Sequence, residues 1–182
     1  MRGSWVIAVA AAALVTGCGH GGRPAAVPSA DASPRLTVTS AAYPDDGTVP
    51  RRHTCDGADV SPPLAFTAVP AGTASLALLL RDFDAPRGPF THWLVWNIDP
   101  HTRQLSAGER PRGAAEGRND FGGTGYGGPC PPRGNRPHHY VLTVYALDRR
   151  LSLAPDASAA GLLRALSGHT LATGTLTGRY SR

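Results

Sequence analysis

The sequence predicts an all-β domain, a sandwich of antiparallel sheets with Greek-key connections and one short helix. Three observations predict it. Short apolar or alternating segments recur between residues 36 and 180, they are separated by turns rich in the chain's 22 Gly and 17 Pro, and only one segment has helical spacing. With 182 residues, 41% of them apolar and 17% charged, the chain is expected to fold as one domain and not to be disordered.

Extended segments are expected at 36–39, 49–54, 64–66, 76–80, 93–98, 140–147 and 171–180. The first alternates apolar and polar residues, which indicates a half-buried strand. The segment 76–80 is continuously apolar, which is typical of a strand buried on both faces, and 93–98 is a second apolar segment. Pro86, in the loop that follows residues 76–80, would stop that strand.

One helix is expected over residues 158–167. Asp156 or Ser158 would cap its N-terminus, its leucines form one apolar side, and Gly168 would end it. Residues 117–139 hold seven Gly and four Pro between two predicted strands. A loop of that length inside a compact domain is uncommon, so it predicts a functional loop.

The N-terminus predicts export and a lipid anchor. Arg2 precedes an apolar run at 5–15 that is too short to span a bilayer, where roughly 20 residues are needed. Small residues before Cys18 resemble a bacterial lipoprotein signal, with an ordinary secretory signal as the alternative. We expect a signal peptide at 1–17, a lipidated Cys18 with a flexible tether to residue 34, and a domain at 35–182 on the outer face of the cell membrane.

Lipidation would consume one of three cysteines and leave Cys55 and Cys130 as an even pair in an oxidising compartment. This pattern predicts a Cys55–Cys130 disulfide, with two buried free thiols as the alternative. The chain has a net charge of +5 and all of its 18 basic residues are Arg. Because these are scattered, no nucleic-acid partner is expected, although anionic ligands would be attracted.

Three groups of residues could carry chemistry. In an extended chain Asp82 and Asp84 share a face, where two carboxylates could act as an acid/base pair, as metal ligands or as partners that orient a histidine. His92 enters the apolar strand at 93–98. The structural alternatives are turn formation by the two Asp and a buried, hydrogen-bonded His92.

The third group is the segment 128–134, GPCPPRG, followed by His138 and Tyr140. Prolines stiffen such a loop, and glycines let the backbone approach a ligand with their N–H groups. A rigid wall with a few donors suits a small oxyanion. The alternative is a solvated loop before a strand.

Together these motifs resemble the phosphatidylethanolamine-binding protein family, in its bacterial branch of Raf-kinase-inhibitor-like proteins. The similar segments, in the family's order and spacing, are Cys55-Asp56-Gly57 with Ser61-Pro62-Pro63-Leu64, Asp82-Phe83-Asp84-Ala85-Pro86, Phe90-Thr91-His92-Trp93-Leu94-Val95-Trp96-Asn97, Asn119-Asp120-Phe121-Gly122, Gly125-Tyr126-Gly127-Gly128-Pro129-Cys130-Pro131-Pro132 and His138-His139-Tyr140. The resemblance covers residues 36–180 and implies the family's β-sandwich with a pocket for phosphate and the phosphoethanolamine head group.

The resemblance also implies roles for individual residues. Its pocket positions fall on Asp82, His92, Pro131, His138 and Tyr140, and its loop wall falls on Gly128, Pro129 and Pro132. Asp84 belongs to the motif, with a less direct relation to the ligand. Two departures are present: Phe83 replaces a common Pro, and the sequence ends at Arg182 without the C-terminal helix of eukaryotic relatives, so their kinase inhibition is not expected here.

These residues suggest a mechanism in which an aspartate favours protonated imidazoles, and His92 and His138 donate N–H groups to an anion beside the Tyr140 hydroxyl. We expect a non-catalytic binding module without a cofactor or metal. One alternative is a protein-interaction or inhibitor module at the cell surface. The other is a hydrolase or metalloenzyme using Asp82, His92 and His138, although HExxH, Gly-x-Ser-x-Gly and phosphate-loop motifs are absent from the sequence.

Overall fold

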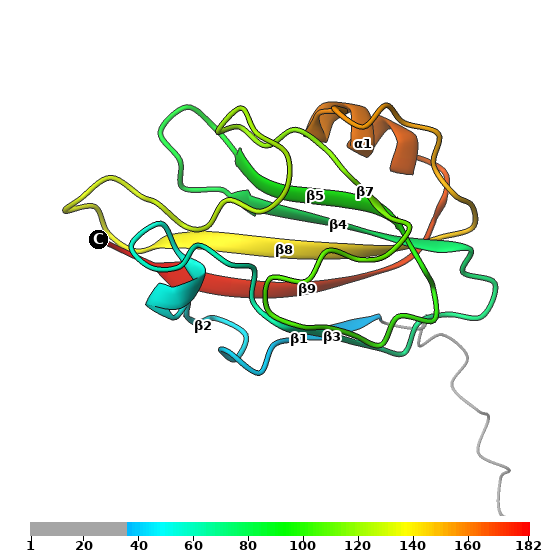
Figure 1. Ribbon diagram of the computed structural model, residues 1–182, viewed down its shortest axis with the longest axis horizontal. Coiled ribbons are helices and arrows are strands. Elements are labelled where there is room, and N and C mark those ends of the chain that lie inside the picture. Colours follow the sequence, from blue (N-terminus) through cyan, green and yellow to red (C-terminus); the bar gives the residue numbers. More distant parts are fainter. Residues whose placement is uncertain (1–35) are drawn as a thin grey trace, which may run out of the picture. The chain divides into compact units, whose positions relative to one another are not determined.

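The computed structural model describes residues 36–182, whose strands form two sheets (Figure 1). The larger sheet has the order β2-β9-β8-β4-β5-β7 and the smaller has the order β1-β3-β6. The strands are β1 (Thr37–Thr39), β2 (Gly47–Thr48), β3 (Leu64–Thr67), β4 (Ser75–Asp82), β5 (Phe90–Ile98), β6 (Gln104–Leu105), β7 (Ala115–Glu116), β8 (His138–Leu147) and β9 (Thr170–Tyr180). The predicted signal peptide, Cys18 and tether lie outside the described residues.

The predicted fold class is confirmed, with one departure from pure antiparallel pairing. All strand pairs are antiparallel except β2 with β9, so the larger sheet is mixed. After β5 the chain contributes β6 to the smaller sheet and β7 to the edge of the larger one. It then returns as β8 beside β4, and this long connection contains the Gly/Pro-rich loop.

Strand β4 is buried on both faces, as its continuous apolar run predicts. Leu76, Leu78 and Leu80 belong to the core between the two sheets. Ala77 and Leu79 point the other way, into a second cluster with the leucines of the helix. Figure 1 shows this helix over one face of the larger sheet and β1 and β3 over the other. Each fully buried Leu side chain contributes about 1.5–3 kcal/mol to folding, so β4 anchors both layers.

The predicted helix is confirmed as α1 (Ala159–Leu166). Ser158, rather than Asp156, caps it, because its hydroxyl accepts the N–H of Gly161 at 3.3 Å. The predicted long loop is also present, since no helix or strand occurs between Glu116 and His138. Within residues 36–182, no helix is long and apolar enough to cross a membrane.

The strand predicted at 49–54 is wrong. Strand β2 ends at Thr48, before this segment begins, and a short 3-10 helix, η1 (Arg51–His53), follows Pro50. Proline lacks the N–H that a strand ladder needs, and its carbonyl instead accepts the N–H of His53 at 2.8 Å. The Thr54 hydroxyl closes this turn on Arg51 O at 2.9 Å. The tight turn brings Cys55 and Asp59 against the Gly/Pro-rich loop instead of into a sheet.

Candidate functional site

A cavity of about 180 Å³ lies where β4 ends and where β5 and β8 begin. Because β4 is antiparallel to both neighbours, its last residue, Asp82, pairs with Phe90 of β5 and with Tyr140 of β8. The sheet register therefore gathers residues that are distant in sequence. We call this 180 Å³ space the histidine cavity. Its lining residues are Asp82, Ala85, Pro86, Phe90, His92, Phe121, Cys130, Pro131, Pro132 and His138.

Asp82 and His138 form a buried pair in the histidine cavity, exposed by 4% and 3%. His138 Nδ1 lies 2.7 Å from Asp82 Oδ2. A carboxylate can only accept, so Nδ1 carries the hydrogen and Nε2 is the ring nitrogen left for other partners. The other Asp82 oxygen accepts the Asp84 N–H at 2.8 Å. Asp82 thus fixes both the tautomer of His138 and the turn that follows β4.

His92 has a different partner. Its Nδ1 lies 2.7 Å from the Gly127 carbonyl oxygen and must donate to it, which leaves Nε2 with a lone pair in the neutral ring. The side chain is buried, and this burial lowers the pKa of His92 below 6.5. The predicted contact between an aspartate and an imidazole is therefore present for His138, whereas His92 bonds a main-chain carbonyl and its lowered pKa leaves it neutral at neutral pH without a ligand.

Tyr140 lies beneath the histidine cavity rather than in its lining. Its ring meets His92 edge-on at 5.2 Å between centroids and stacks on His138 at 6.4 Å. The hydroxyl is buried and has no hydrogen-bond partner among the described residues. Burial, together with the charge of Asp82, raises the pKa of Tyr140. The Tyr140 hydroxyl, which was predicted to donate to the ligand, is therefore buried under the two histidines.

Only some residues of the predicted loop wall line the histidine cavity. Pro131 and Pro132 line the cavity, whereas Gly128 and Pro129 are not among its lining residues. Gly128 donates to Asp59 Oδ1 at 2.7 Å, and a Cβ there would lie 2.5 Å from the His53 carbonyl, so only glycine fits. The Cys55 N–H bonds Pro129 O at 3.2 Å.

The Cys55–Cys130 disulfide predicted from the sequence is formed, with an S–S distance of 2.04 Å and 5.4 Å between Cα atoms. It links the turn after η1 to the long loop and places Cys130 in the cavity lining.

Asp84 does not line the histidine cavity. Its carboxylate accepts the N–H and Nδ1 of His139, at 2.8 and 2.7 Å, and pairs with Arg136 Nη2 at 2.9 Å. The hydrogen bonds from His139 hold the pKa of Asp84 below its usual range. This residue ties the turn after β4 to the start of β8, and so supports the cavity from outside.

Five lining residues were not among the predicted ligand-binding residues: Ala85, Pro86, Phe90, Phe121 and Cys130. The Phe121 ring packs edge-on against Phe90 and His92 at 4.8 and 5.2 Å between centroids, yet 52% of this residue is exposed. Both phenylalanines stand inside the motif segments, and an aromatic residue within a glycine-rich loop is the signal that could have identified Phe121.

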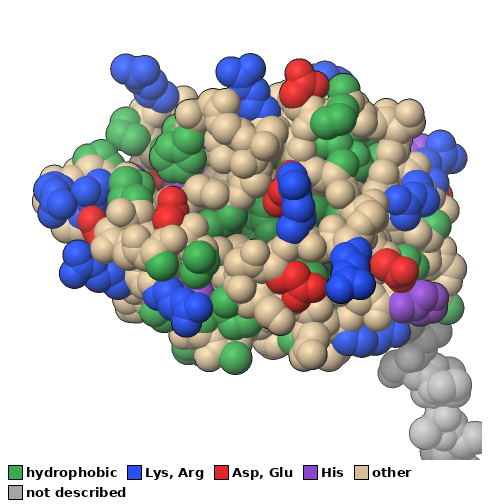
Figure 2. Space-filling model, in the orientation of Figure 1, with side chains coloured by type: hydrophobic (Ala, Val, Ile, Leu, Met, Phe, Trp, Pro, Cys, Tyr) green, Lys and Arg blue, Asp and Glu red, His purple; other side chains and the backbone are tan. Residues whose placement is uncertain are grey.

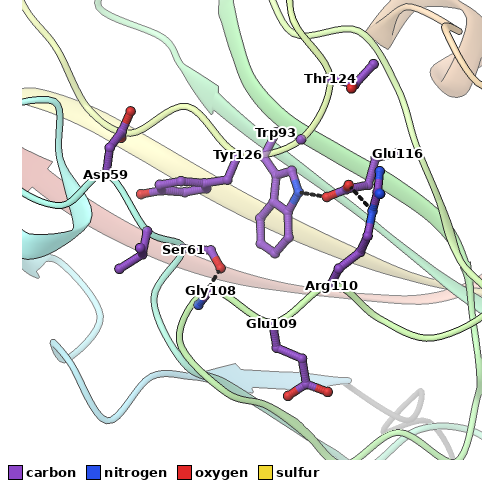
Figure 3. Close-up of a pocket in the computed structure, with 11 residues that line it drawn as sticks. Asp59, Ser61, Trp93, Gly108, Glu109, Arg110, Glu116, Thr124 and Tyr126 are labelled. Atoms are coloured by element: carbon purple, nitrogen blue, oxygen red, sulfur yellow. Dashed lines mark hydrogen bonds and ion pairs between the residues drawn. The ribbon is translucent and has the colours of Figure 1, made fainter.

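A second surface feature, which we call the tryptophan hollow, has a volume of about 440 Å³ and includes Trp93, Tyr126, Glu116 and Arg110 (Figure 3). Trp93 Nε1 donates to Glu116 at 2.9 Å, and Arg110 forms an ion pair with the same carboxylate. The charges at its centre therefore neutralise each other. Within residues 36–182, no group of three His, Cys, Asp or Glu side chains has an arrangement that could hold a metal ion.

Comparisons with known proteins agree with this geometry. The family model for phosphatidylethanolamine-binding protein matches residues 39–181. A UPF0098 protein of Pyrococcus abyssi is 43% identical over 154 residues, which cover 81% of this chain and 86% of the relative. A Mycobacterium tuberculosis protein named "Putative lipoprotein LppC" is 38% identical over 193 residues, with 94% and 96% covered.

Among solved structures, Escherichia coli YbcL, described as a member of the mammalian PEBP family, superimposes with a TM-score of 0.77 and 34% identity. The match covers 81% of this chain and 99% of YbcL. The family model spans more than half of the chain, and relatives above 30% identity are covered over most of their length. The chain belongs to the phosphatidylethanolamine-binding protein family.

Proposed function

We propose that this protein binds a small phosphorylated anion, of the class of phosphate or a phosphoethanolamine head group, in the histidine cavity, and that it does so without transforming it. The observation that carries the proposal is the convergence of two buried imidazoles behind a rigid proline wall in about 180 Å³. The lining residues include no Ser, Thr or Lys, and the one Cys is held in a disulfide. The lining therefore lacks a hydroxyl, amine or free thiol nucleophile, which favours binding over covalent catalysis by such a group.

The two histidines would supply the polar contacts. Asp82 orients His138 so that Nε2, which lies 3.4 Å from Asn135 Nδ2, is the ring nitrogen available to a ligand. The Gly127 carbonyl likewise leaves Nε2 of His92 available. An arriving anion favours the protonated form of each ring, which turns Nε2 into a donor. A hydrogen bond between charged groups contributes about 1.5–3 kcal/mol, so two of them suit an affinity in the micromolar to millimolar range.

Surface charge supports the same ligand class. Arg87, Arg133 and Arg136 stand next to lining segments, and the side chains of Arg133 and Arg136 are 75% and 79% exposed. Figure 2 shows basic side chains gathered at the end of the molecule where β8 begins. With a net charge of +5, the protein would attract anions toward this end before the cavity selects among them.

We further propose that the protein is exported and anchored by lipid at Cys18 on the outer face of the cell membrane. The small residues before Cys18 support this, as does the name of the M. tuberculosis relative. A disulfide suits an oxidising compartment outside the cytoplasm.

The test is a thermal-shift titration of the full chain in detergent with inorganic phosphate and with O-phosphoethanolamine. His92→Ala and His138→Ala are compared with His101→Ala, whose histidine is exposed and remote from the cavity lining. We expect saturable stabilisation in the wild type and in His101→Ala, reaching about 2.7 kcal/mol at 100 times the dissociation constant, and its loss in both cavity variants. A folded wild-type protein that tens of millimolar ligand leaves unshifted would contradict the proposal and favour a protein partner instead.

A further inference from the structure

A third hollow adjoins the histidine cavity and has no assigned role. It has a volume of about 550 Å³, and its floor includes the Cys55–Cys130 disulfide. We call it the disulfide hollow. It shares Phe121 and Cys130 with the histidine cavity, and it shares Thr124 and Tyr126 with the tryptophan hollow in Figure 3. A ligand bound beside His92 would therefore lie next to the disulfide hollow.

Three polar side chains of the disulfide hollow already make hydrogen bonds within the protein. Asn119 accepts the N–H groups of Phe121 and Gly123, each at 3.1 Å, and donates to Gly125 O at 3.0 Å. The Tyr126 hydroxyl donates to the His53 carbonyl at 2.6 Å. Asp59 accepts the Gly128 N–H, and its negative charge disfavours a second anion. The disulfide and two aromatic rings remain to contact a guest, so this space suits an apolar group.

Phe121 forms the partition between the two spaces. Its ring is braced by Phe90 and His92, and a Cβ on Gly127 would lie 2.6 Å from it, so Gly127 is what gives the ring room. The residue is nevertheless 52% exposed, so much of its apolar surface remains uncovered. An apolar guest in the disulfide hollow would cover part of that surface, which favours binding.

We propose that the disulfide hollow is a second subsite, which holds the compact apolar substituent of a phosphate monoester whose phosphate lies beside His92 and His138. The inference rests on the proposed function and specifies its ligand class. The phosphate of a monoester would accept the same hydrogen bonds from Nε2 of His92 and His138 that the proposed function describes. The ester oxygen would then direct the substituent past Phe121 and over the disulfide.

Gly123 allows a direct test, because it lines the disulfide hollow but not the histidine cavity. A Cβ at Gly123 would have only Asn119 Oδ1 at 4.0 Å as a neighbour, so Gly123→Trp can fill the hollow from outside. Thr124→Phe, at an exposed lining position, is a second filling variant in case the first does not fold. Ala160→Trp, on the exposed side of α1, is the matched control.

The experiment measures the affinity of the full chain in detergent, by calorimetry at neutral pH, for inorganic phosphate, O-phosphoethanolamine and phenyl phosphate. We expect phenyl phosphate to bind about tenfold more tightly than either other probe, because only its substituent is apolar. The filling variants should lose this advantage and keep the wild-type affinity for inorganic phosphate, while Ala160→Trp should keep both.

Equal affinities for phenyl phosphate and inorganic phosphate in the wild type would overturn the second subsite while leaving the proposed function intact. The same holds if the filling variants weaken both probes equally. Absence of binding by every probe would overturn the proposed function and, with it, this inference.

Discussion

The histidine cavity and the tryptophan hollow both contain ionisable side chains, but they differ in what those side chains bind. In the tryptophan hollow, Glu116 is satisfied by Trp93 and Arg110. Beside the histidine cavity, the Tyr140 hydroxyl has no partner among the described residues, and the hydrogen bond of buried His92 to Gly127 O uses only one of its two ring nitrogens, Nδ1. Buried polar groups are normally satisfied, so these exceptions support the proposal that a ligand binds in this region.

The largest effect on folding is expected from Glu116→Ala. This change leaves the buried Trp93 N–H without an acceptor, which costs about 1–3 kcal/mol of unfolding free energy, while the exposed Arg110 pair adds little. Urea denaturation measures the loss, and Glu116→Gln, which keeps an acceptor, should lose less. Phosphate affinity should stay at its wild-type value in both variants; a parallel loss of affinity would show that the two regions are not independent.

The sequence predicted the parts of the fold that local patterns encode. The continuous apolar run of β4 predicted burial on both faces, and Ser158 with Gly168 bounded the helix. The strand predicted at 49–54 does not form, because Pro50 lacks the N–H that a strand ladder needs and the chain turns into η1 instead.

The motif residues Asp82, His92 and His138 also line one cavity, as the resemblance to the family implies. The state of His92 could not be predicted, because its partner is a main-chain carbonyl 35 residues away and any residue could supply that oxygen. The disulfide hollow could not be predicted from the sequence for a similar reason. It depends on how the turn after η1 packs against the long loop, which no periodicity in either segment encodes.

A smaller effect is expected from pH, with opposite signs for folding and for anion binding. Folded His92 has a lowered pKa, so below about pH 6.5 the unfolded chain binds more protons and the stability of the free protein falls until the lowered pKa is passed. Sulfate, whose charge is constant in this range, should bind more tightly as His92 becomes protonated, by at most about tenfold per pH unit for one proton.

Calorimetric titration of sulfate and urea denaturation of the free protein, both between about pH 7.5 and 5.5, test this pair of trends. His92→Gln removes the titrating ring at similar size, so the part of each trend due to His92 should disappear in that variant. Sulfate affinity that is independent of pH in the wild type would mean that the imidazole does not reach the anion.

The smallest effect is expected from Tyr140→Phe, which removes the hydroxyl that has no partner among the described residues and leaves the ring between the two histidines. An unsatisfied buried hydroxyl costs free energy, so the variant should be as stable as the wild type or more stable by about 1 kcal/mol in urea denaturation. Tyr126→Phe is the matched control, because its hydroxyl donates to His53 O at 2.6 Å and its loss should destabilise the protein. If Tyr140→Phe were instead destabilised to the same extent, the hydroxyl would have a partner in solution, with the nearby Asp82 carboxylate as the acceptor that also raises the pKa of Tyr140.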